Sequence, residues 1–595
     1  MRASFESIGA FGGLAIFRHP MDPIKQRMAG LRPKSGVAYA MREAIAEGYN
    51  RRDFRSDLMA GLSVGVVGLP LSMALGIAVG VRPENGLYTA IVAGALIAIF
   101  GGSRVQVSGP TAAFVVILAP IVHAHGISGL MVATLMAGVI LLGLGLARMG
   151  RAISLVPYPV VTGFTAGIGI VIALLQLKDF LGLTVTGMPE GTIGKTVMLL
   201  EGLGTTHWPD FAIGVGTLVT LFLWSRWIQR VPAALVAILM ATVVAWLAHL
   251  IWPSFELATV MSKFATPEAP SGIPRALPAL AMPWGTEINL ALVEALLPAA
   301  VAIALLGAIE SLLSAVVADG MTEHRHDPDG ELVGQGIGNI VAPFFGGIAA
   351  TGAIARTAIN VRSGARSPIA AVVQCAFLVA ALLVLAPMLG QVPMAAMAAL
   401  LLFVAWNMAD LGHVVRMVRS SPGSDVVVLL TCLGLTVATN MVWAVLIGVA
   451  LAGLLFIRRM MEVSTVQLIS DREGHAARTI PGVRIYDVGG PMFFGAAQRA
   501  MRALEQVDDQ TRAVVLDLVD VPAMDATALV NLESAAATLM KRGVPMFIGG
   551  LQEQPGVAIR RSCTEWNVKP QVFATIEEAV LAAEQVVRAR APTQH

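Results

Sequence analysis

Long apolar runs fill most of this chain and limit it to a fold embedded in a membrane. Between residues 58 and 457 the hydrophobic stretches are long enough to cross a hydrocarbon core of about 30 Å. The composition agrees, because 56% of the 595 residues are hydrophobic, only 13% are charged and the mean hydropathy is +0.73. A protein with a fully solvated surface carries more charge than this. In lipid the backbone must bond to itself, so these runs are predicted to be helices.

About fourteen spans are predicted when short and broken segments are included. They lie at 58–80, 86–101, 110–124, 128–147, 153–177, 210–229, 233–252, 290–318, 333–346, 353–363, 367–390, 393–410, 424–440 and 441–457. We describe this as a polytopic α-helical membrane protein. The first span is expected to act as an uncleaved signal, because no short apolar core with a small-residue cleavage site precedes it.

The basic residues between the spans predict the orientation in the membrane. One set of loops carries Arg51, Arg52, Arg55, Arg148, Arg151, Arg226, Arg230, Arg362, Arg366, Arg416, Arg419, Arg458 and Arg459. The opposite loops carry only Arg82, Lys178, Lys195, Lys263 and Arg275. Since Lys and Arg are enriched on the cytoplasmic side, both termini are expected in the cytoplasm, with the protein in the cell (inner) membrane.

Two spans end in the same motif, 245 residues apart. Phe100–Gly102 leads into Ser108–Ala113, and Phe345–Gly347 leads into Thr351–Ala358. We interpret both as broken helices, in which an extended stretch of small residues precedes a short apolar helix. The free N–H groups at the start of each short helix would lie near the middle of the bilayer and favour an anion.

The repeat extends upstream of the broken helices. Arg82–Glu84 and Asp327–Asp329 stand at the same offset, so seven spans are predicted to repeat as seven. An odd number of spans inverts the second copy and places a binding site where the two copies meet. Gly and Pro can also simply loosen helix packing, but two copies in register favour a site. We therefore expect a carrier of anions.

Two ionisable residues inside predicted spans indicate the chemistry. Glu310 has no basic residue within a helical turn, and lipid favours its protonated form, so it is predicted to take up and release a proton. Ser314, one turn on, could hydrogen-bond Glu310 or a ligand. Arg356 lies in the first turn of the tenth span, where it would attract carboxylate or sulfate oxygens. The alternatives are a Glu310 bonded to a neighbouring helix and an Arg356 that reaches the membrane interface.

Three stretches of the sequence, one of which contains Glu310, resemble motifs of the SulP, or sulfate permease, family. The similar stretches are 108–113, 163–167 and 307–313, and the resemblance covers residues 50 to about 585. It implies a seven-plus-seven inverted repeat with broken helices 3 and 10. Spans 1–4 and 8–11 would form a core domain and the others a gate domain, usually in a homodimer with an elevator-like motion.

The resemblance also suggests a substrate. Residues 319–322, 355–365 and 396–408 look most like the bacterial branch that carries four-carbon dicarboxylates such as succinate, fumarate and aspartate. Glu310 and Ser314 stand where sodium-coupled bicarbonate relatives have aspartate and threonine. Glutamate there resembles the proton-coupled members, so we expect symport with protons.

The resemblance further implies which residues form the anion site. The two half-helix ends would be supplied by Ser108, Gly109, Thr111 and Ala112 on one side and by Ala355, Arg356 and Thr357 on the other. Leu71 and Leu75 of the first span fall where some relatives have glutamine and phenylalanine. They would line the apolar wall of the site.

A soluble domain is predicted from about residue 461, where charged residues return. Residues 483–488, 513–518 and 545–548 are expected to be strands, and 495–507, 525–541 and 575–590 helices, in an α/β fold with parallel strand pairs. This part resembles the STAS domain. Thr527 is a candidate phosphosite with Asp525 as the helix cap, and ordinary capping without modification is the simpler alternative.

The predicted organisation is therefore a cytoplasmic segment at 1–57, a transporter domain at 58–460 and a cytoplasmic STAS domain with its tail at 461–595. Nucleic acid is excluded as a partner, because the net charge is only +2 and no basic run is interleaved with aromatics. The ten histidines and three cysteines form no metal pattern, and neither a nucleophile elbow nor a phosphate-binding turn occurs. We expect neither an enzyme nor a cofactor.

Several functions other than dicarboxylate symport stay open. They are a sulfate or bicarbonate transporter of the same family, an uncoupled anion channel, and a membrane scaffold that signals anion binding through the STAS domain. The expected partners are a small anion, protons, the lipid bilayer, a second copy of the chain and a cytoplasmic protein that binds the STAS domain.

Overall fold

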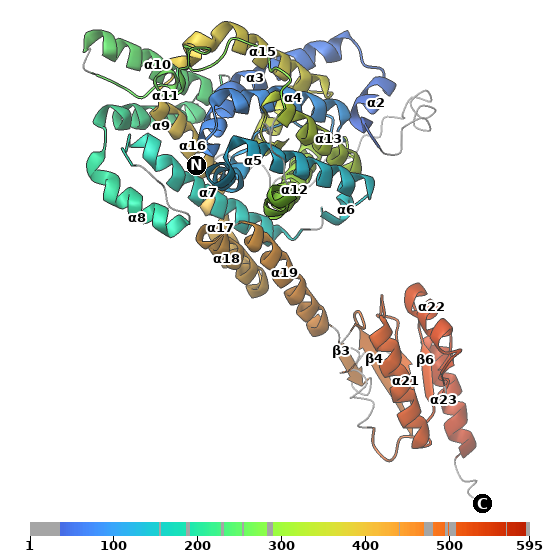
Figure 1. Cartoon of the computed structure of the whole chain (residues 1–595). Coiled ribbons are helices and arrows are strands. Elements are labelled where there is room, and N and C mark those ends of the chain that lie inside the picture. The colour runs from blue at the N-terminus through green and yellow to red at the C-terminus, as the bar shows by residue number, and fades with distance from the viewer. Residues whose placement is uncertain are drawn as a thin grey trace, which may run out of the picture. The chain divides into compact units, whose positions relative to one another are not determined.

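The computed structural model describes residues 36–153, 156–185, 191–227, 231–252, 255–282, 290–439, 441–463, 465–468, 480–493, 498, 507–566 and 568–590. They form two compact units, Met1–Val449 and Ala450–His595. The first unit is a helical bundle that also holds one pair of two-residue strands, and the second contains a five-stranded β-sheet (Figure 1).

Each predicted span corresponds to a helix. The helices are α3 (Arg51–Val79), α4 (Pro83–Phe100), α5 (Ala112–Leu146), α7 (Tyr158–Phe180), α9 (Trp208–Trp227), α10 (Ala233–Ile251), α12 (Leu290–Met321), α13 (Pro328–Val341), α14 (Ile354–Arg362), α15 (Ile369–Gly390), α16 (Met394–Ala409), α18 (Gly423–Ala438) and α19 (Met441–Val463). Within the described ranges, ten helical stretches are long and apolar enough to cross a membrane. The predicted class, a polytopic helical membrane protein, is confirmed.

Two predicted spans, 110–124 and 128–147, lie within α5. The backbone is non-helical at Gly126, where φ is 66° and ψ is −173°, so the two spans are separate helical segments on either side of this break, as predicted. Shorter elements precede the first span or connect later ones. They are α2 (Tyr39–Ala46), α6 (Gly150–Ile153), α8 (Thr192–Gly202), α11 (Val260–Phe264) and α17 (Leu411–Ser420), with single 3-10 turns at Leu203–Thr205 and Ala342–Phe345.

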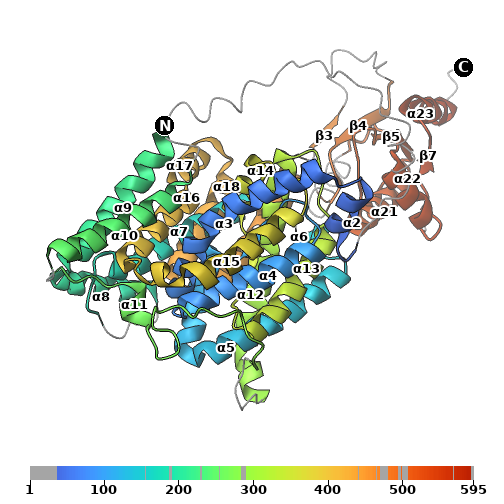
Figure 2. The ribbon, with the colours of Figure 1, turned by 90° about the horizontal axis from the view of Figure 1, so that it is seen from above.

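The long helices of the first unit pack in two groups. One group contains α3, α4, α5, α12, α13, α14 and α15, and the other contains α7, α9, α10, α16 and α18. Figure 2 shows α9 and α10 at one edge of the bundle, away from α13. These groups correspond to the expected core and gate domains.

The N-terminal segment contributes a helix to the first group. The N–H of Ala38 donates to the carbonyl of Phe100 at 2.8 Å, at the end of α4. Arg104 is buried and pairs with Glu43 of α2 at 3.0 Å and with Glu47 at 2.6 Å. Helix α2 therefore binds the chain that follows the first Gly-Gly motif. The eight residues of α2 are a mixture of polar and apolar types, and they did not predict this role.

The second unit is an α/β layer structure. Its sheet has the order β3-β4-β5-β6-β7, with β3 (Thr465–Leu468) antiparallel to β4 (Val483–Gly489). The remaining pairs, which involve β5 (Ala513–Asp517), β6 (Met546–Gly549) and β7 (Gln571–Val572), are parallel. Helices α21 (Ala526–Lys541), α22 (Glu553–Ser562) and α23 (Ile576–Arg590) flank the sheet.

The three predicted strands and two of the predicted helices of this unit are confirmed. The third predicted helix, 495–507, lies almost wholly outside the described residues. Strands β3 and β7 and helix α22 were not predicted, because they are short and carry mixed residues.

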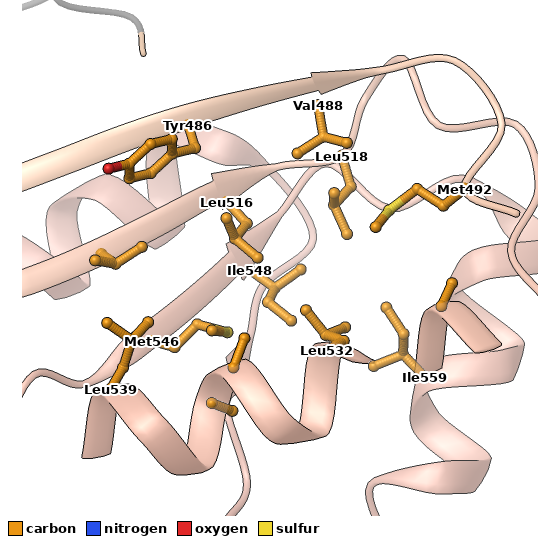
Figure 3. Close-up of a cluster of buried hydrophobic side chains, with 14 of the residues drawn as sticks. Tyr486, Val488, Met492, Leu516, Leu518, Leu532, Leu539, Met546, Ile548 and Ile559 are labelled. Carbon is orange, nitrogen blue, oxygen red and sulfur yellow. The ribbon is translucent and has the colours of Figure 1, made fainter. Parts of the chain in front are cut away.

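Both faces of the sheet are covered. Leu516 and Ile548 face Leu532 and Leu539 of α21 on one side (Figure 3). Ala513 and Val515 pack with α23 on the other. Alternate residues of one strand point to opposite faces of the sheet. Because both faces are covered here, every residue of the run Ala513–Leu516 is apolar.

Asp525 caps α21, and its loss is expected to loosen the first turn. One of its carboxylate oxygens accepts the N–H of Ala528 at 2.8 Å. Replacing an N-cap Asp by Ala costs about 1 kcal/mol, which corresponds to about fivefold faster hydrogen exchange at Ala528 in the full-length protein. Asp525→Asn keeps the acceptor and should retain protection. Unchanged exchange in Asp525→Ala would show that the cap is not needed.

Candidate functional site

The two broken helices meet in a short antiparallel strand pair. β1 (Ser108–Gly109) pairs with β2 (Thr351–Gly352), with Ser108 opposite Gly352 and Gly109 opposite Thr351. Helix α5 begins at Ala112 and α14 at Ile354, so both start directly after their strand. Because the strands are antiparallel, the two helices leave the pair in opposite directions. The predicted broken helices and their inverted relation are confirmed.

Small residues make this crossing possible. A Cβ added to Gly352 would lie 2.1 Å from Nε2 of Gln106, and the Cα of Ser311 on α12 would be 3.1 Å away. The strand therefore runs so close to its neighbours that a larger residue would collide with them. This close approach is the physical reason for the glycine-rich sequence at the break.

Glu310 lies at the start of helix α5. Its side chain is buried on α12, and Oε2 accepts the hydroxyl of Thr111 at 2.9 Å. Thr111 is the N-cap residue of α5, but its hydroxyl makes no capping bond to the helix. The carboxyl group is therefore bound through Thr111 to the helix end that is expected to favour an anion.

Ser314 and Thr357 connect α12 to the other half-helix. The hydroxyl of Ser314 donates to Oγ1 of Thr357 at 3.1 Å, and this same oxygen accepts the N–H of Val107 at 3.0 Å. Thr357 thus joins the first turn of α14 to the chain that enters β1. Ser314 holds this junction from one helical turn beyond Glu310.

Arg356 is buried in the first turn of α14, with 2% of its surface exposed. Its Nη2 donates to the carbonyl of Pro110, directly before α5. Its Nε and Nη1 have no hydrogen-bond partner among the residues that the structure describes. The burial rules out an arginine that reaches the membrane interface. A buried guanidinium with unbonded N–H groups is costly unless an anion or another acceptor occupies the space beside it.

The remaining predicted site residues lie on α5, α14 and α3. Ala112 is the buried first residue of α5, and Ala355 is exposed in the first turn of α14. Leu75 is buried and Leu71 is half-buried on α3, which packs against α5 and α14. The structure therefore brings both half-helix ends, Glu310 and Ser314 together. It shows no direct contact that assigns Leu71 and Leu75 to the site.

Three site-supporting residues were missed by the sequence analysis. Glu331, Gln335 and Asn339 of α13 are 1%, 0% and 0% exposed. Their spacing of four residues on an apolar, glycine-rich helix is the signal that could have identified them, because it puts three polar side chains on one face.

Comparisons with known proteins agree with this architecture. Residues 54–431 match the sulfate permease family, and residues 475–579 match the STAS domain. The chain belongs to the sulfate permease family. It is 41% identical over 528 residues to the putative sulfate transporter YvdB of Bacillus subtilis, covering 89% of this chain and 97% of that protein. It is 31% identical over 526 residues to the bicarbonate transporter BicA of Picosynechococcus sp., covering 84% and 90%.

The fold also matches a solved structure. The murine anion transporter Slc26a9 in its inward-facing state superposes with a TM-score of 0.78 at 18% identity, covering 98% of this chain and 97% of that one. At this identity the match supports the fold alone. Together these findings establish a multi-pass anion transporter of the sulfate permease family with a C-terminal STAS domain, and not an enzyme.

Gly109 offers a direct test of the placement of Arg356. A Cβ at this position would lie 2.9 Å from Nη1 of Arg356 and 3.3 Å from Nη2, at a φ of 157°. Gly109→Ala should displace the guanidinium and weaken anion binding about tenfold, a loss of about 1.4 kcal/mol. The measurement is the half-saturating anion concentration for uptake into proteoliposomes.

Gly143→Ala is the matched control, because a Cβ there meets nothing within 4 Å. It should leave uptake unchanged. Equal half-saturation in Gly109→Ala and in the unsubstituted transporter would contradict the assignment of Arg356 to the site.

Proposed function

We propose that this transporter moves a small oxyanion together with protons, with the dianion sulfate as the first candidate and the monoanion bicarbonate as the second. The observation that carries the proposal is Arg356, which is buried beside the start of α5 with two nitrogens unbonded. A guanidinium and two helix N-termini of about half a charge each amount to roughly two positive charges. A dianion balances this charge when Glu310 is protonated.

The proton would be coupled to the anion by competition for one helix end. An ionised Glu310 places its own negative charge on the hydroxyl of Thr111 and on the start of α5. It would therefore repel an incoming anion. Protonation removes that charge, so proton and anion are expected to bind together and to leave together. An elevator-like movement of the core group of helices against the gate group would then expose the site to each side in turn.

The dicarboxylate interpretation has less support than the proposal of sulfate or bicarbonate transport. YvdB and BicA are named as sulfate and bicarbonate transporters, and both align over most of this chain. A four-carbon dicarboxylate also presents two separated carboxylates, whereas the site offers one arginine. Succinate and its relatives therefore stay as the second class of candidate substrate.

A competition panel on purified protein tests the proposal. Uptake of labelled sulfate into proteoliposomes is measured against bicarbonate, succinate, fumarate and aspartate, at acidic and at neutral external pH. We expect saturable sulfate uptake that an inward proton gradient accelerates. Succinate uptake that sulfate does not inhibit would restore the dicarboxylate assignment. Current without saturation would indicate a channel, and the absence of any flux would indicate a scaffold.

The remaining expectations from the sequence are also proposals. They are a homodimer in the inner membrane, cytoplasmic termini, and a division into residues 1–57, 58–460 and 461–595. Thr527 is exposed in the first turn of α21, where a kinase and a cytoplasmic partner could both reach it. Phosphoproteomics of the native membrane and labelling of introduced cysteines from each side would test these points.

A further inference from the structure

One face of α13 makes an unusual number of polar contacts for a helix inside an apolar bundle. Glu331, Gln335 and Asn339 are spaced by four residues and are almost completely buried. Polar side chains in such a place are destabilising unless each finds a partner. Their partners lie on the two extended stretches that form the anion site.

Glu331 binds the stretch that leads into β1. Its Oε2 accepts the backbone N–H groups of Gly102 and Ser103 at 3.1 and 3.2 Å. Its Oε1 accepts the side chains of Gln106 at 2.9 Å and Ser311 at 2.8 Å. Ser311 is the residue after Glu310, so this carboxylate also connects the first break to the helix that carries the proposed proton site.

Gln335 continues the same contact one turn further along the helix. Its Nε2 donates to Oγ of Ser108 at 3.1 Å and to Oγ of Ser311 at 2.8 Å. Ser108 is the first residue of β1. The side chain therefore holds β1 directly, two residues before the loop that Arg356 contacts at Pro110.

Asn339 binds the second extended stretch. Its Oδ1 accepts the N–H of Ala350 at 2.8 Å, and its Nδ2 donates to the carbonyl of Ala350 at 2.9 Å. Ala350 directly precedes β2. Three side chains on one helix face thus hold both strands of the crossing.

We propose that this polar face of α13, formed by Glu331, Gln335 and Asn339, is a positioning element that sets the register of β1 against β2 and so places Arg356 beside the start of α5. A pair of two-residue strands cannot hold its own register, because so short a ladder is unstable alone. The inference rests on the proposed anion site. It assigns to these residues a role in substrate affinity without contact with the substrate.

Asn339 provides the sharpest test, because a protonated aspartate reproduces both of its bonds to Ala350 and loses only the bond from Nδ2 to the carbonyl of Gln335 in the same helix. Asn339→Leu removes the donor and the acceptor for Ala350 at similar size. Protonated Asp can accept the N–H of Ala350 and donate to its carbonyl, whereas ionised Asp can only accept. The experiment compares half-saturating sulfate concentrations in proteoliposomes with those of the unsubstituted protein at acidic and neutral pH.

We expect the half-saturating sulfate concentration of Asn339→Leu to be about tenfold higher, or more, than that of the unsubstituted protein at both pH values. The sulfate affinity of Asn339→Asp should match that of the unsubstituted protein at acidic pH and should be weaker at neutral pH. Thr134→Val is the control, because within the described part of the chain the buried hydroxyl of Thr134 bonds only to the carbonyl of Leu130 in its own helix. Unchanged affinity in both Asn339 variants, or equal weakening of Asn339→Asp at the two pH values, would overturn the inference.

A second readout separates this inference from the proposed function. If the unsubstituted protein neither binds nor moves sulfate, the substrate assignment fails. The positioning role is then judged by hydrogen exchange at residues 350–352. Faster exchange there in Asn339→Leu than in Thr134→Val supports it, and equal exchange overturns it.

Discussion

Glu310→Gln is expected to abolish proton-driven accumulation of the anion and to leave exchange of labelled for unlabelled anion intact. Gln keeps the size of the side chain and an acceptor for the hydroxyl of Thr111, which lies 2.9 Å from Glu310. It cannot take up or release a proton in the membrane, so the anion would no longer be coupled to the gradient. The measurement is uptake into proteoliposomes with and without an inward proton gradient. The internal-to-external ratio should fall to the value without a gradient.

Asp57→Asn is the matched control for this result. Asp57 is also buried, but its partners differ from those of Glu310: it accepts the hydroxyl of Tyr49 at 2.9 Å and the N–H of Arg366 at 2.7 Å. Its replacement should reduce the amount of folded protein more than the accumulation per folded molecule. Gradient-driven accumulation in Glu310→Gln at the level of the unsubstituted protein would remove the proton-coupling assignment.

Arg356→Gln is expected to weaken anion binding by at least about thirtyfold, since hydrogen bonds to a charged group contribute about 2 kcal/mol. The substitution removes the buried positive charge and the two buried nitrogens that have no hydrogen-bond partner among the described residues. Arg356→Lys keeps the charge but not the planar fork, so its affinity should fall between those of Arg356→Gln and the unsubstituted protein. Binding of labelled sulfate to purified protein gives the affinities.

Arg362→Gln tests whether any positive charge on α14 would serve equally well. Arg362 is exposed in the last turn of the same helix. Its removal should change the affinity by no more than about twofold, because an exposed charge is screened by water and salt. If the two Arg→Gln variants bind sulfate equally well, Arg356 is not the anion-binding residue.

Glu310 and Arg356 were selected as candidate site residues because each is an ionisable residue in a predicted span. An ionisable side chain in an apolar span is costly, so its presence alone calls for a functional or structural reason. Each was found without knowledge of the fold. Their partners, Thr111 on α5 and Pro110 before it, could be named only once the segments were placed side by side.

The polar face of α13, in contrast, could not be interpreted from the sequence alone. Glu331 binds backbone groups 228 and 229 residues away, so no local pattern points to them. The docking of α2 on Arg104 escaped prediction for the same reason, since Glu43 and Arg104 are 61 residues apart. In both cases the sequence shows the polar residue but does not show which groups it binds.

The amino-acid sequence by itself determined the helical spans, the two breaks, their inverted repetition and the α/β class of the C-terminal domain. These features depend on local hydropathy and on glycine, because lipid forces the backbone to bond within each segment. Only the tertiary structure decided that β1 pairs with β2, that Thr111 holds Glu310 and that α13 supports both breaks. A buried polar group takes whichever partner the packing brings within reach, and the sequence order does not specify that neighbour.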